Sequence, residues 1–268
     1  MAEVIVLNSY GLTAGALRYF HFREVVNQAL DPEHRAKLDP GGVSAAMLLQ
    51  LTDLFQPGLL YLSEFLMRLR IEYLLGVSYP HTALTYQVQT KCLEQIAAYG
   101  PERLYTALKK QVAAQLKELG LTYSFKRSDL LNDADYGATL REVWPLLQLD
   151  EGFAESPECC HALCGLLACA ELITTAAQRL LRQRCQQEQI VVPNPDRSPG
   201  SKLGPTWQHV CFLFACDLIS IYLGDDHQTE LVNMRPLDHQ IVQALGAPWN
   251  QIYDSHTIKQ FGFEPSAV

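Results

Sequence analysis

Apolar residues recur every three or four positions through most of the first 120 residues, the spacing that places them on one face of a helix. Proline and glycine interrupt the pattern, for example at Pro57, Gly76 and Gly100, where helices commonly begin or end. The sequence therefore predicts five helices in this half of the chain. They span residues 11–30, 43–55, 59–75, 82–99 and 101–119.

The second half predicts one long helix and only short strands. From Ser156 to about Gln189 the pattern is helical, apolar on nearly all sides before Ala170 and rich in arginine and glutamine after it, so we expect its front half to be buried. Residues 193–200 contain three prolines and indicate an exposed linker. The remaining predicted elements are strands at 121–125, 217–223 and 230–232 and helices at 206–214 and 236–245.

Composition places this pattern in a globular protein. The chain has 268 residues, of which 48% are hydrophobic and 19% charged, so it has enough apolar residues to build a core. Its formal net charge is −8, which excludes a protein that coats nucleic acid by bulk charge. The acidic excess lies after residue 130, so any surface for a polyanion belongs to the first half.

Basic residues on the polar faces of the predicted helices are candidates for contacts with nucleic-acid phosphates. A solvated helix face, the more common role of such residues, is the alternative interpretation. The candidates are Arg68, Arg70, Lys91, Arg103, Lys109, Lys110 and Lys117.

Two clusters have residue types that bind metals. Cys160 and Cys164 share a helix face, but no second Cys-x-x-Cys pair accompanies them, so buried thiols are favoured over zinc and we expect no metal there. Asp129, Asp133 and Asp135 have the oxygen ligands that Mg²⁺ prefers, although such clusters are also typical of turns. We find no phosphate-binding loop, dinucleotide-binding glycine pattern or nucleophile elbow.

The chain shows no sign of secretion or membrane insertion. No basic segment followed by a long apolar run opens it, and no uninterrupted apolar run reaches the roughly 18 residues that a spanning helix needs. We therefore expect a cytoplasmic protein without membrane contact, whose eight cysteines are reduced.

Several blocks in this order resemble the transposases of bacterial insertion sequences, in which a helical N-terminal domain precedes an RNase-H-like core with an Asp-Asp-Glu metal site. The resemblance covers most of the chain. Its N-terminal blocks are Tyr-Gly-Leu at 10–12, Asp-Pro-Gly-Gly-Val at 39–43, Leu-Tyr-Leu-Ser-Glu-Phe at 60–65, Glu-Tyr-Leu-Leu-Gly at 72–76, Cys-Leu-Glu-Gln-Ile at 92–96 and Tyr-Gly-Pro-Glu-Arg-Leu-Tyr at 99–105. The later blocks are Pro-Leu-Leu at 145–147, Ser-Pro-Glu at 156–158 with the helix through 179–187, Gly-Pro-Thr-Trp at 204–207 through 214, and 241–253.

The resemblance implies a catalytic core with an internal deletion. Lys126 stands where the family carries its first catalytic Asp, and a lysine cannot replace a carboxylate as a Mg²⁺ ligand. Few residues separate Gly137 from Pro145, where the family has most of its core. The implied parts are a helical N-terminal domain at 1–120, a core remnant with the deletion junction at 121–155, and a C-terminal helical region with short strands at 156–268.

We therefore expect a mostly α fold, with a helical N-terminal domain, a truncated RNase-H-like remnant and a long C-terminal helix. Its few strands should not assemble into a proper sheet, because the central strands of the core are missing.

The resemblance implies a DNA-binding, catalytically inactive protein with no catalytic residues and no cofactor. Its expected partners are the terminal repeats of an insertion sequence, a second copy of this chain and a full-length transposase. An enzyme that holds Mg²⁺ on Asp129, Asp133 and Asp135 is one alternative. Another is an interaction protein or non-functional remnant that binds no DNA, in which residues 162–170 pack against a partner subunit.

Overall fold

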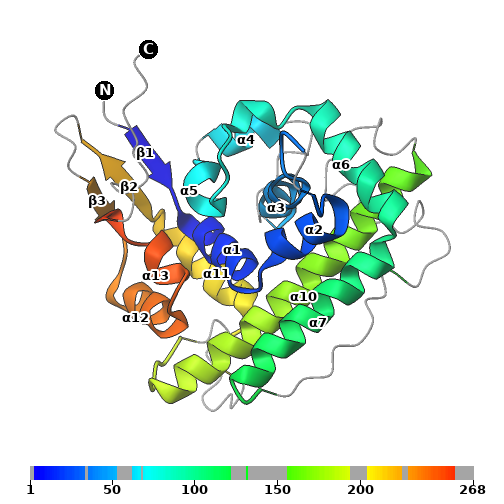
Figure 1. Ribbon diagram of the computed structural model, residues 1–268. Coiled ribbons are helices and arrows are strands. Elements are labelled where there is room, and N and C mark those ends of the chain that lie inside the picture. The colour runs from blue at the N-terminus through cyan, green and yellow to red at the C-terminus, as the bar shows by residue number, and fades with distance from the viewer. Residues whose placement is uncertain are drawn as a thin grey trace.

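The protein is mostly α-helical in a computed structural model, as the sequence predicts (Figure 1). The structure describes residues 3–33, 36–52, 62–67, 69–121, 131, 156–193, 204–224 and 229–256. Most of the predicted core remnant at 121–155 therefore lies outside the described residues, and so does most of the strand predicted at 121–125.

Seven α-helices and one 3₁₀ helix are described before residue 121. They are α1 (Asn8–Tyr19), α2 (Phe22–Leu30), α3 (Pro40–Leu51), α4 (Leu62–Met67), α5 (Ile71–Leu75), the 3₁₀ helix η2 (His81–Ala83), α6 (Tyr86–Tyr99) and α7 (Pro101–Glu118). The later helices are α10 (Pro157–Gln187), α11 (Trp207–Asp217), α12 (Pro236–Leu245) and α13 (Trp249–Ile252).

Two helices predicted as continuous are each broken in two, so that part of the prediction is wrong. His21, with φ 53°, separates α1 from α2, and Arg70, with φ 50°, separates α4 from α5. A residue in this left-handed region stops the regular helical hydrogen bonding. Apolar spacing does not reveal such a break, because both halves carry apolar residues that the fold buries on different neighbours.

The short strands form a three-stranded antiparallel sheet, contrary to the expectation that they would not assemble. The strands are β1 (Glu3–Val6), β2 (Ser220–Leu223) and β3 (Thr229–Val232), in the order β1-β2-β3. Ile5 pairs with Ile221, and Ile221 pairs with Leu231. The sheet is completed by β1, from the start of the chain, where the sequence predicted no strand. With four residues, β1 is too short to give a recognisable alternating pattern.

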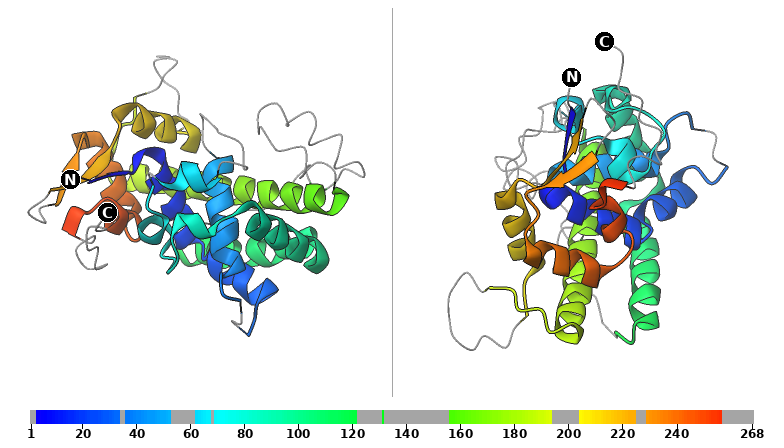
Figure 2. Two further views of the ribbon diagram at one scale, coloured as in Figure 1. Left: turned by 90° about the horizontal axis from the view of Figure 1, so that it is seen from above. Right: turned by 90° about the vertical axis from the view of Figure 1, so that its left-hand side faces the viewer.

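The long helix α10 forms the centre of the fold. It packs on α7, α6, α1, α3, α11 and α12, and α7 runs beside it along much of its length (Figures 1 and 2). Its most apolar stretch has a mean hydropathy of 1.6 and is 72% buried inside the protein, as expected of a core helix. Gly165 permits close contact with α7, since a Cβ there would lie 2.5 Å from Cβ of Pro101.

The predicted burial of the front half of this helix is confirmed. Ala162, Leu163 and Leu166 are fully buried, and they are buried within the chain itself. Packing of residues 162–170 on a partner subunit stays an untested alternative.

The two ends of the chain share one hydrophobic core. Trp249 donates a hydrogen bond from its indole nitrogen to the carbonyl oxygen of Leu12 at 2.9 Å, and the hydroxyl of Tyr73 donates to the carbonyl oxygen of Ile252 at 2.6 Å. Two glycines on α1 make room for this packing: a Cβ on Gly15 would lie 2.3 Å from the Trp249 ring. The predicted regions 1–120 and 156–268 are thus packed together.

Candidate nucleic-acid interface

Helix α7 has one buried face and one exposed face. It begins at Pro101, directly after Gly100, whose φ of 101° favours glycine and lets α6 end and α7 begin at the same residue. Leu104, Leu108 and Val112 are at most 1% exposed and pack toward α10, α2 and α6. The amphipathic pattern thus leaves the opposite face of α7 in solvent.

Three cations lie in a line on that exposed face. Arg103, Lys110 and Lys117 are all exposed and follow one another at intervals of seven residues. Seven residues make almost two full helical turns, so successive charges lie about 10 Å apart at nearly the same angle around the helix. We call these three residues the α7 stripe.

Within the α7 stripe, Arg103 is held in place and the two lysines are free. The guanidinium of Arg103 lies 4.5 Å from the ring centroid of Tyr99, and its Nη1 donates a hydrogen bond to the Tyr99 carbonyl oxygen at 3.2 Å. Lys110 and Lys117 form no hydrogen bond or ion pair within the described part of the chain. Their charges are therefore available for an external anion.

Acidic residues on α7 lie outside the stripe. Glu102 points to α10, where its Oε1 lies 2.9 Å from Nε2 of His161. Glu118 is exposed at the end of the helix, next to Lys117, and partly offsets its charge. The positive character of the face is thus strongest at Arg103 and Lys110.

The other basic residues predicted to contact DNA do not belong to the α7 stripe. Lys109 is partly buried, and Lys91 is exposed on α6. Arg70 lies at the break before α5, which packs on α1 and α3, whereas α7 packs on α10, α2 and α6. Arg68 lies outside the described residues.

A groove adjoins the α7 stripe at Lys110. Its volume is about 490 Å³, and its lining comes from α2, α6 and α7, including Gln28, Tyr99, Lys110 and Gln111. The amide groups of Gln28 and Gln111 can donate and accept hydrogen bonds, and Tyr99 supplies aromatic surface. The sequence did not predict this groove, because it exists only where α2 packs on α7.

The predicted catalytic positions lie in the segment between α7 and α10. Lys126, Asp129, Asp133 and Asp135 all lie outside the described residues. Within the described ranges, no group of three or more His, Cys, Asp or Glu residues is arranged to hold a metal ion.

The cysteines in the core are unsuited to nucleophilic chemistry. Cys160 and Cys164, the pair considered for zinc, are both buried in α10. Burial raises the pKa of Cys92 to about 12, although a hydrogen bond with Ser44 opposes this shift. Burial alone raises the pKa of Cys169 to about 12. The thiols of Cys92 and Cys169 therefore stay protonated at neutral pH.

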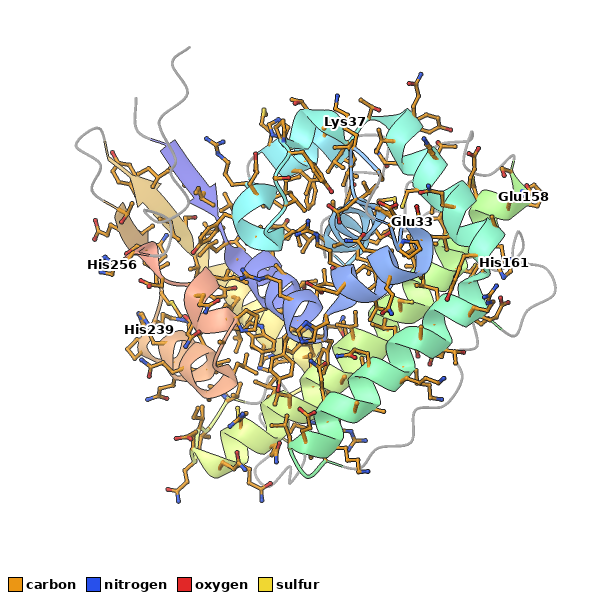
Figure 3. All side chains as sticks on the ribbon, viewed as in Figure 1. Glu33, Lys37, Glu158, His161, His239 and His256 are labelled. Atoms are coloured by element: carbon orange, nitrogen blue, oxygen red, sulfur yellow. The ribbon has the colours of Figure 1, made fainter. Side chains whose placement is uncertain are left out.

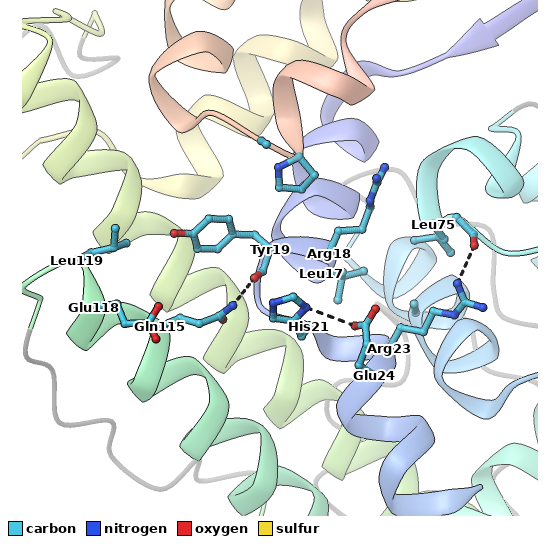
Figure 4. Close-up of a pocket in the computed structure, with 14 residues that line it drawn as sticks. Leu17, Arg18, Tyr19, His21, Arg23, Glu24, Leu75, Gln115, Glu118 and Leu119 are labelled. Carbon is cyan, nitrogen blue, oxygen red and sulfur yellow. Dashed lines mark hydrogen bonds and ion pairs between the residues drawn. The ribbon is translucent and has the colours of Figure 1, made fainter. Parts of the chain in front are cut away.

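A second pocket, of about 560 Å³, lies between α1, α2, α7 and the turn at Ala247-Pro248 (Figure 4). Charged side chains of both signs line it, among them Arg18, Arg23 and Glu118. Gln115 donates a hydrogen bond to the Tyr19 carbonyl oxygen at 2.7 Å across one end. No sequence motif marks this pocket, since its walls come from segments far apart in the chain.

Comparison with known proteins finds one similarity. A family described as a domain of unknown function (DUF4277) matches residues 2–110, from the start of the chain into α7. No curated protein and no solved structure matches the chain. The family description names no activity, so the relationship to transposases remains a proposal.

Proposed function

We propose that this chain is a transposase-derived protein of a bacterial insertion sequence that binds DNA through the α7 stripe and has no catalytic activity. The observation that carries the proposal is the line of Arg103, Lys110 and Lys117 on the solvent face of α7. The transposase part of the proposal rests on the sequence resemblance, which includes the block at 99–105.

The geometry suits a phosphate backbone. The three charges span about 20 Å along a straight helix, a length over which duplex DNA offers several phosphates. Backbone contacts position a protein on DNA without reading its sequence, so the stripe accounts for affinity and orientation. Because the whole chain carries a charge of −8, binding depends on this local surface and is weakened by salt.

The proposed lack of catalysis rests on the sequence. Lys126 occupies the place that the resemblance gives to the first catalytic carboxylate. Phosphoryl transfer in such a site depends on metal ions held by carboxylates, so their loss removes the mechanism. The protein would then compete with an active transposase for the ends of the element.

The test is a binding titration with the terminal repeats of a related element, a scrambled duplex and a salt series. We expect specific binding by the parent and at least tenfold weaker binding by the variant Lys110→Gln/Lys117→Gln. Lys37→Gln is the matched control, because Lys37 is an exposed lysine in the segment between α2 and α3, away from α7 (Figure 3).

Two results would contradict the proposal. Absence of binding to either duplex at any salt concentration would favour the interaction protein or remnant instead. Nicking of the terminal repeats in the presence of Mg²⁺ would refute the proposed lack of catalysis.

A further inference from the structure

The pocket between α1, α2 and α7 contains a cation, Arg18, whose guanidinium has no carboxylate in direct contact. Of the other side chains that line it, Arg23 forms an ion pair with Asp39, and the His21 ring lies 3.9 Å from Glu24. The Arg18 side chain forms no hydrogen bond and no ion pair within 4 Å in the described part of the chain, and Figure 4 marks interactions for Tyr19, His21 and Arg23 but none for Arg18.

Partial burial makes the charged form of Arg18 less favourable. The side chain is partly buried, and this burial lowers the pKa of its guanidinium, with nearby Tyr73 and Glu24 opposing the shift. Arginine nevertheless stays charged at neutral pH. A partly buried cation without a hydrogen-bonded anion is less well stabilised than a paired one, and an anionic ligand in the pocket would supply that anion.

The opposite end of the pocket offers hydrogen-bond acceptors. In Figure 4 Gln115 and Glu118 lie on the α7 side, with His21 between them and Arg18. The side-chain oxygen of Gln115 is buried and has no hydrogen-bond partner. The side-chain nitrogen of Gln115 donates a hydrogen bond to the carbonyl oxygen of Tyr19. An unpaired buried acceptor is unfavourable, so a ligand hydroxyl group that reached it would be bound favourably.

We propose that this pocket binds a small phosphorylated polyol, with its phosphate on Arg18 and its hydroxyl groups toward Gln115 and Glu118. A guanidinium binds two oxygens of a phosphate at once, which favours this anion over a halide. The volume of about 560 Å³ lies in the range of small-molecule sites. The proposal does not depend on DNA binding, because none of its residues belongs to the α7 stripe.

The test uses the full chain and three probes: ribose 5-phosphate, inorganic phosphate and ribose. We expect ribose 5-phosphate to raise the unfolding temperature in a saturable manner, phosphate to raise it less, and ribose to leave it unchanged. Calorimetric titration of Arg18→Met should show at least a tenfold loss of affinity for ribose 5-phosphate. Lys37→Met, which alters a cation outside the pocket, should bind like the parent.

The stability of the Arg18→Met variant separates a ligand-binding role from a structural one. Because the substitution removes an unpaired and partly buried charge, the variant should unfold at the same temperature as the parent or at a higher one. A lower unfolding temperature would make Arg18 structural and overturn the proposal. So would a parent protein that millimolar ribose 5-phosphate fails to stabilise, or equal binding by Arg18→Met.

Discussion

Arg23 and Asp39 form a two-point ion pair: Nε of Arg23 lies 2.9 Å from Oδ1 of Asp39, and Nη2 lies 3.1 Å from Oδ2. Asp39 is also the N-cap of α3, where its carboxylate accepts a hydrogen bond from the backbone nitrogen of Gly42 at 2.7 Å. Arg23 in addition donates to the carbonyl oxygen of Gly76 at 2.7 Å. The Asp39 carboxylate thus connects α2 to α3, and the Arg23 guanidinium connects these two helices to the end of α5.

Replacing this carboxylate should destabilise the protein. Asp39→Ala removes the cap of α3 and leaves Arg23 partly buried without its anion, so we expect a loss of about 2 kcal/mol in the free energy of unfolding. Chemical denaturation measures the change. Lys37→Gln, nearby in the same segment but exposed, should stay within about 0.5 kcal/mol of the parent. Equal stability of Asp39→Ala and the parent would show that the network is not stabilising.

The same network predicts a dependence of stability on pH. Burial would raise the pKa of Asp39, but hydrogen bonds from Arg23, Asn27 and Gly42 outweigh this and hold its pKa below the usual 3.8. A carboxyl group with a depressed pKa stabilises the fold above its unfolded pKa, and this contribution is lost as the pH falls through the folded value. Denaturation between pH 6 and pH 3 should therefore show a smaller acid-induced loss in Asp39→Ala than in the parent.

The packing of α13 on α1 predicts a sensitive glycine. In Gly15→Ala the added methyl group would overlap the Trp249 ring, whose nearest atom lies 2.3 Å from the Cβ position, so we expect a loss of about 1–3 kcal/mol. Gly204→Ala is the control, because the nearest described atoms to its Cβ belong to the Arg182 side chain, at 3.1 Å and beyond. Thermal unfolding of both variants tests the packing, and an unchanged midpoint for Gly15→Ala would contradict it.

The α7 stripe predicts a specific change in salt dependence. If Lys110 and Lys117 each neutralise one phosphate, the double glutamine variant should lower the slope of log K against log salt by about 1.8. Binding should weaken about equally for specific and scrambled duplex, because phosphate contacts carry no sequence information. A variant with the parent's slope would place the DNA contacts elsewhere on the protein.

The sequence by itself determined most of the helices. The apolar spacing of α7 and α10 located both closely, and the predicted strands at 217–223 and 230–232 overlap β2 and β3. These features are local, since spacing, prolines and helix caps act over a few residues. The sequence also predicted that Arg103, Lys109, Lys110 and Lys117 lie on the polar side of α7; three of them are exposed, whereas Lys109 is partly buried.

The tertiary structure determined the features that depend on contacts between segments far apart in the chain. The breaks at His21 and Arg70 and the pairing of β1 with β2 depend on which surfaces each segment buries, which a local pattern does not encode. Arg18 and Gln115 lie on different helices, α1 and α7, and only the tertiary structure brings them to the same pocket. Whether a charge or a hydrogen-bond acceptor has a partner depends on which groups surround it in the folded protein. The spacing of residues along the chain does not give those neighbours.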